Sequence, residues 1–122
     1  DYCVDHHFAG LIRLLDDDHR ANALRAAIEA RNIDAAPLDE TQKLGLVYAE
    51  QLTVSPAALT EDTVIQLRSA GFSDGEILEI NQVAAYFNYA NRTVLGLGCS
   101  TAGDILGLSP NNSDNPDDWS HT

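Results

Sequence analysis

Residues 71–95, GFSDGEILEINQVAAYFNYANRTVL, decide the fold class that the sequence predicts. Ser73 is followed three positions later by Glu76, a spacing that is typical of a capping box at the start of a helix. From about Asp74 to Leu95, apolar residues recur at steps of three and four, which predicts one long helix with a single apolar face. The residues on that face are Ile77, Ile80, Val83, Ala84, Phe87, Ala90, Val94 and Leu95.

The two segments before this helix follow the same period. Asp39 is expected to cap a helix over residues 41–52, TQKLGLVYAEQL. Thr60 is expected to cap the next helix, and Gly71 stands where the left-handed backbone at a helix end favours glycine. The residues that the 41–52 helix is expected to bury are Leu44, Val47, Tyr48 and Leu52.

The first third of the chain also has helical spacing. An apolar face over residues 8–15 is interrupted by three consecutive aspartates at positions 16–18. Residues 19–31 are rich in Ala and Leu and favour a second helix, and Pro37 ends that neighbourhood. The apolar residues of the first segment are Phe8, Leu11, Ile12, Leu14 and Leu15. Since no segment alternates with the period of a strand, the sequence predicts an all-α fold.

The composition changes after residue 96. We expect residues 1–96 to form a helical core and residues 97–122, rich in Gly, Asn, Asp, Ser and Pro, to form an extended or flexible arm. Trp119 is expected to anchor this arm against its own or a neighbouring subunit. The chain contains no methionine, so we also expect an N-terminal part of the domain to precede Asp1.

Charge and cysteine content restrict the class of protein. The 122 residues carry a formal net charge of −12, which disfavours binding to the phosphate backbone of nucleic acids. The sequence has no apolar run near the ~20 residues that a membrane helix needs, so no membrane partner is expected. Two isolated cysteines suit a reducing compartment better than a disulfide-rich scaffold, which predicts a cytoplasmic protein.

The candidate chemistry lies at the start of the chain, in DYCVDHH. Cys3 and His7 are four residues apart, so on a helix they share one face. The first turn of a helix also presents free N–H groups and the positive end of the helix dipole, which favour a thiolate. These features indicate an activated nucleophilic or redox thiol, although the spacing also fits an inert buried cysteine beside a surface histidine.

Two further groups of polar residues have competing interpretations. Cys3, His6, His7 and the run 16–19 supply ligand types that suit zinc, but their spacings are not those of a closed structural site. Within FNYANR, residues 87–92, Asn88 and Arg92 either line a pocket and orient the first helix or form a hydrogen-bond network, and we favour the network. The aromatic residues Tyr86, Phe87 and Tyr89 are expected in the core or at an interface.

Several of these segments together resemble a known family. They are YCVDHH, the helix start GFSD-E-I, the run FNYANR and the downstream segment GLG-STAGD-LGLSP. The chain resembles the AhpD-like alkylhydroperoxidases, in their peroxidase-related branch within the carboxymuconolactone decarboxylase superfamily. The family motif is C-x-x-C-x-x-x-H at a helix start, in which Cys3 matches the second cysteine and His7 the histidine. The first cysteine of that motif would lie immediately before Asp1.

The resemblance implies an AhpD-like helical bundle and a thiol-dependent peroxidase of alkyl or hydrogen peroxides in antioxidant defence. It implies that Cys3 forms the sulfenic acid, that His7 relays the proton, and that an external dithiol of the thioredoxin or lipoyl type is the reductant. It implies no metal, haem or flavin. His6 is a weaker catalytic candidate, and Cys99 is not assigned the resolving role. Members of the family assemble, so a homo-oligomer, a dimer or larger, is expected.

Two other functions fit the same resemblance. The superfamily includes a decarboxylase, whose chemistry would not need Cys3. The chain would alternatively be a non-catalytic, redox-sensing oligomeric protein in which Cys3 is oxidised once and changes the assembly.

Overall fold

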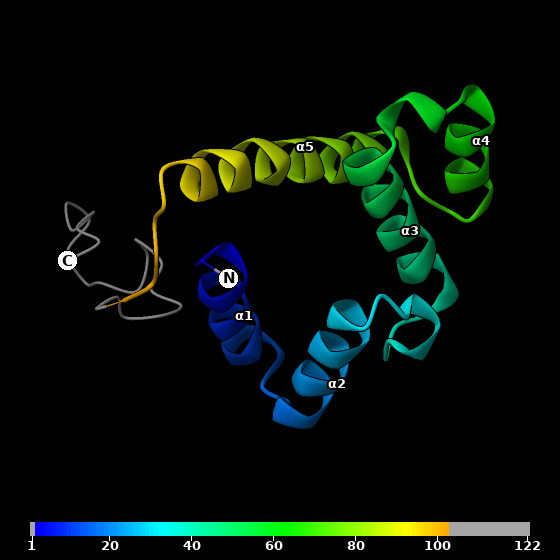
Figure 1. The fold of residues 1–122 in the computed structure, drawn as a ribbon. Helices are drawn as coiled ribbons and strands as arrows, with labels where there is room; N and C mark the ends of the chain where they lie inside the picture. The colour runs from blue at the N-terminus through cyan, green and yellow to red at the C-terminus, as the bar shows by residue number, and fades with distance from the viewer. Residues whose placement is uncertain (1, 103–122) are drawn as a thin grey trace, which may run out of the picture.

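The computed structural model describes residues 2–102, and all of its regular secondary structure is helical (Figure 1). No strand occurs within this range, which confirms the predicted all-α class. The C-terminal arm from residue 103 onward, including Trp119, lies outside the described residues. The helices are α1 (Tyr2–Leu15), α2 (Asp18–Glu29), α3 (Glu40–Val54), α4 (Glu61–Ser69) and α5 (Asp74–Gly96), with short 3-10 turns η1 (Ile33–Ala35) and η2 (Pro56–Ala58).

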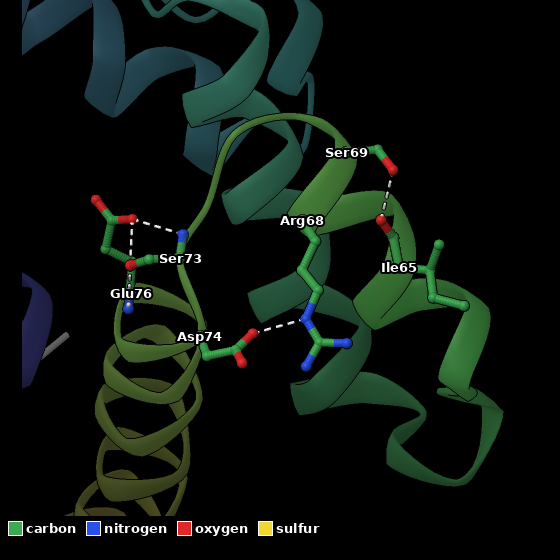
Figure 2. Close-up of polar contacts among 6 residues, drawn as sticks. All are labelled: Ile65, Arg68, Ser69, Ser73, Asp74 and Glu76. Carbon is green, nitrogen blue, oxygen red and sulfur yellow. Dashed lines mark hydrogen bonds and ion pairs between the residues drawn. The ribbon is translucent and has the colours of Figure 1, made fainter.

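The α4–α5 junction is set by local chemistry that the sequence predicts. Gly71 has φ +109°, so its backbone lies in the region that side chains rarely adopt and reverses the chain after α4. Ser73 then caps α5: its backbone N–H donates to Glu76 Oε2 at 2.8 Å, and its hydroxyl accepts from the Glu76 N–H at 3.3 Å (Figure 2). Arg68 Nε and Asp74 Oδ1, 2.6 Å apart, join the last turn of α4 to the first turn of α5. The predicted left-handed glycine at the end of α4 and the predicted capping box of α5 are both confirmed.

The hydrophobic core lies where α3, α4 and α5 meet. Leu67 is 1% exposed and packs with the buried residues Tyr48 and Ile77. Full burial of one leucine side chain contributes about 1.5–3 kcal/mol, so Leu67 is a main attachment of the short helix α4. The buried Gly45 lets α3 approach this core, because a Cβ there would lie only 3.2 Å from Phe72 Cζ. Partly buried side chains surround the cluster: Leu44, Leu52, Leu59, Val64, Phe72 and Ile80.

Helices α1 and α2 pack side by side, and the N-terminal end of α1 lies toward the C-terminal half of α5 (Figure 1). Helix α2 begins one residue before the predicted segment, with Asp17 Oδ1 accepting from the Arg20 N–H at 2.9 Å. Its buried residues, Ala21 and Ala27, are small and allow close helix packing. No helix within residues 2–102 is both long enough and apolar enough to cross a bilayer.

The predicted apolar faces are only partly covered. On α5, Ile77 is buried, whereas Val83 and Leu95 are 56% and 60% exposed. On α1, Leu14 is 86% exposed. Periodicity marks which side of a helix is apolar, but burial requires a neighbouring element. The core formed with α3 and α4 covers α5 around Ile77 and Ile80. Val83 faces another side of the helix, and Leu95 lies on the same side as Ile77 but about five turns further along.

Candidate functional site

Cys3 is the second residue of α1, so it lies in the first helical turn as the sequence predicts. Its side chain is half-buried, and both Cys3 and the exposed Cys99 are free thiols. His7 follows one turn later on the same face of α1. His6 is half-buried and occupies the neighbouring position on the helix.

The imidazole of His7 packs against α5. Its ring centroid lies 4.7 Å from that of Phe87 with an interplanar angle of 84°, an edge-to-face arrangement. Within residues 2–102 no hydrogen bond joins His7 to the Cys3 thiol. The two residues therefore share a helix face, and the contact that orients His7 comes from α5.

The aromatic residues of α5 have different environments. Phe87 is half-buried and also meets the ring of Tyr86, at 5.4 Å and 73°. Tyr86 and Tyr89 are 61% and 69% exposed. These two tyrosines are therefore not in the core of the described chain, because their side of α5 is not the side that α3 and α4 cover, and the alternative of an interface position stays a prediction.

Arg25 of α2 contacts α1 in two ways. Its guanidinium group lies 3.3 Å from Asp5 Oδ1, and its central carbon lies 5.0 Å from the centroid of the Phe8 ring. Its Nε donates to Glu29 Oε1 at 2.6 Å, which fixes the side chain along α2. The hydrogen bond to Glu29, followed by the bond to Asp5, raises the pKa of Arg25 above its ordinary value. The sequence did not reveal this contact, since Arg25 and Asp5 are twenty residues apart.

The polar residues of FNYANR form hydrogen bonds within α5 and to α3. Asn88 Nδ2 donates to Thr53 Oγ1 at 3.2 Å, and Asn91 Nδ2 donates to the Phe87 carbonyl at 2.9 Å. The guanidinium of Arg92 donates to the Asn88 carbonyl at 2.8 Å. These bonds support the network interpretation for Asn88 and Arg92.

An open groove of about 390 Å³ lies between α2, α3 and α5. Its lining combines apolar with polar side chains, and Phe87, whose ring also contacts His7, forms part of it. Asn88 therefore lines a groove as well as joining the network, whereas Arg92 is not among its lining residues. The lining residues are Ile28, Arg31, Ile33, Leu46, Ala49, Glu50, Thr53, Val54, Ala84, Phe87, Asn88 and Asn91.

The alternative set of metal ligands is not brought together. The run at residues 16–19 lies at the junction of α1 and α2, and Cys3 lies near the opposite end of the 14-residue helix α1. At 1.5 Å per residue, about 18–20 Å of helix separates them. Within residues 2–102 no three His, Cys, Asp or Glu side chains are placed to hold one metal ion.

Comparison with known proteins assigns no family to this chain. It matches no protein-family model and no curated protein sequence. The function proposed below therefore rests on the residues, their placement and the resemblance described above.

Proposed function

We propose that the chain is a thiol-dependent peroxidase of alkyl or hydrogen peroxides, with Cys3 as the nucleophile. The observation that carries the proposal is the placement of Cys3 in the first turn of α1, one turn before His7. In proteins generally, cysteines at helix N-termini tend to be reactive nucleophiles, and a histidine four residues later shares the cysteine's helix face and can serve as its proton acceptor. His6, next to His7 in the sequence, is a weaker candidate for the same role of proton acceptor.

The proposed reaction is a two-electron oxidation of Cys3. The thiolate attacks the terminal peroxide oxygen, so that an S–O bond forms and the O–O bond breaks. Sulfur is oxidised to the sulfenic acid, and the peroxide is reduced to an alkoxide or hydroxide. That anion takes the proton that His7 received from the thiol and leaves as an alcohol or water.

The sulfenic acid is returned to the thiol by an external dithiol, of the thioredoxin or lipoyl type. One thiol of the reductant condenses with the sulfenic acid, releasing water and leaving a mixed disulfide. The second thiol attacks that disulfide, which oxidises the reductant and frees Cys3. In the family pattern an internal cysteine resolves the sulfenic acid first; its position would lie immediately before Asp1. A reducing cytoplasm would supply such dithiols.

Peroxide consumption by matched cysteine variants tests the proposal. With dithiothreitol as the reductant, Cys3→Ser should abolish consumption of tert-butyl hydroperoxide, and Cys99→Ser should leave it unchanged. His7→Ala should slow it. Equal rates for Cys3→Ser and the parent chain would refute the proposal.

The same samples separate the two alternative functions. A superfamily decarboxylase would keep its turnover after alkylation of Cys3. A redox sensor would consume one equivalent of peroxide per Cys3 and then stop, even with several reductants present.

We further propose that the chain forms a homo-oligomer through the outer side of α5. Leu78, Tyr86 and Tyr89 are 56–69% exposed there, and tyrosine is a residue type enriched in protein interfaces. These three side chains carry no charge, so the contact would not oppose like charges even though each chain carries −12.

A further inference from the structure

Helix α1 presents two different faces to its neighbours. Cys3 and His7 lie on one face of α1, Asp5 lies about 160° from both around the helix axis, and Phe8 lies about 100° from His7 on the Asp5 side. His7 meets Phe87 of α5, and the opposite face meets α2.

Arg25 is the α2 side chain that meets this opposite face. Its guanidinium group is paired with Asp5 Oδ1 at 3.3 Å and lies over the Phe8 ring at 5.0 Å. The carboxylate and the ring are three residues apart on α1, so the two contacts together oppose rotation of the helix about its axis. The bond of 2.6 Å from Arg25 Nε to Glu29 holds the guanidinium group in the required position.

We propose that Arg25 is a positioning residue, which fixes the rotation of α1 that places His7 against Phe87 of α5. This inference rests on the proposed role of Cys3 as the reactive thiol. Arg25 touches neither Cys3 nor His7 in this scheme and acts on them through Asp5 and Phe8. When the contact is lost, α1 samples other rotations, and His7 spends less time in the orientation in which it takes the Cys3 proton.

The test measures the reactivity of Cys3 without any peroxide. Alkylation by iodoacetamide is followed from pH 5 to 10 in a Cys99→Ser background, so that Cys3 is the reporting thiol of this chain. Because the thiolate is the species that reacts, the pH midpoint reports the proton affinity of Cys3. The ionisable groups around the contact are those of Asp5, His6 and His7 on α1, those of Arg25 and Glu29 on α2, and the N-terminal amino group, which is the largest influence lowering the pKa of Asp5.

Arg25→Met keeps the aliphatic stem and removes both contacts to α1. We expect the midpoint of alkylation to rise by about 0.5 pH unit, and the rate below the midpoint to fall about threefold, since a tenfold change corresponds to one unit. Arg25→Lys should recover most of the rate, because an ammonium group can still pair with Asp5. Arg20→Met, at an exposed position on the same helix, is the matched control and should behave as the parent.

The effect should depend on His7. In a His7→Ala background, Arg25→Met should change the rate by less than about 1.5-fold, since two residues that act through one contact are not additive. Far-UV circular dichroism checks that the variants remain folded. If Arg25→Met does not fold, Arg25→Leu removes the same guanidinium group from α2 and should reproduce the upward shift.

Three results would overturn the inference. They are an unchanged midpoint in folded Arg25→Met (or in Arg25→Leu where that variant replaces it), an equal change in Arg20→Met, and an undiminished effect in the His7→Ala background. Failure of the proposed function looks different. In that case Cys3→Ser would still consume peroxide, whatever the alkylation profile of Cys3.

Discussion

The contact between His7 and Phe87 makes a quantitative prediction about stability. It joins α1 to α5 across eighty residues of chain, by two rings 4.7 Å apart at 84°. His7→Ala removes one ring, and Phe87→Leu removes the other while keeping an apolar side chain of similar size. If the rings attract each other in solution, the double variant should lose less stability than the sum of the single variants.

The expected coupling is about 0.5–1 kcal/mol. Aromatic pairs contribute about 0.5–1.5 kcal/mol beyond the burial of their area, and the lower half of this range applies because His7 is exposed and Phe87 only half-buried. Phe87→Leu alone should cost more, about 1–2 kcal/mol, because it also removes the ring contact with Tyr86 at 5.4 Å. The double-mutant cycle of His7→Ala and Phe87→Leu isolates the part of this free energy of unfolding that depends on the His7 ring.

Urea denaturation followed by circular dichroism, at one protein concentration, measures the four free energies of unfolding. The matched control is a cycle of His7→Ala with Tyr89→Leu, since Tyr89 is an exposed ring on the same helix. That cycle should be additive within about 0.3 kcal/mol. A coupling for His7 and Phe87 no larger than in the control would refute the idea that α5 orients this histidine.

Two further predictions concern assembly and pH. Light scattering after size exclusion should show a dimer or larger species, and Tyr86→Glu should shift it toward monomer by placing a charge in the contact; a stable parent monomer would contradict the proposed homo-oligomer. Hydrogen bonds from the side chain and then the backbone of Ser73 lower the pKa of Glu76 below its ordinary value of 4.5. The ionised cap therefore adds stability that is fully present above about pH 4.5 and is lost as the pH falls further. Ser73→Ala should therefore lower the thermal midpoint at pH 7 more than at pH 3, whereas equal decreases at the two pH values would show that the cap does not depend on the ionised carboxylate.

Features that depend on near neighbours in the chain could be predicted from the sequence. The cap at Ser73 needs only Glu76 three residues later, and the turn at Gly71 needs only a residue that tolerates φ +109°. The position of Cys3 in a first helical turn, with His7 on the same face, follows from the same short-range geometry. For these three features, the conformation that the nearby residues favour is the one found in the folded chain.

Features that depend on distant neighbours could not be predicted. The exposure of Leu14 and Val83 follows from which helices pack where, and the period of the sequence does not carry that information. In the sequence, nothing around Arg25 distinguishes it from any other surface arginine of an Ala-rich helix. Its contacts with Asp5 and Phe8 exist because α1 folds back against α2.

The candidate site combines both kinds of feature. Helical spacing places Cys3 and His7 on one face, but the orientation of the imidazole depends on a ring of α5, and the rotation of α1 depends on its opposite face. The reactivity of Cys3 is therefore proposed to be sensitive to substitutions of Phe87 on α5 and of Arg25 on α2. A short motif of a cysteine and a histidine is consequently a weak guide to reactivity, because the same four-residue spacing would occur in α1 with neither Phe87 nor Arg25 to hold it.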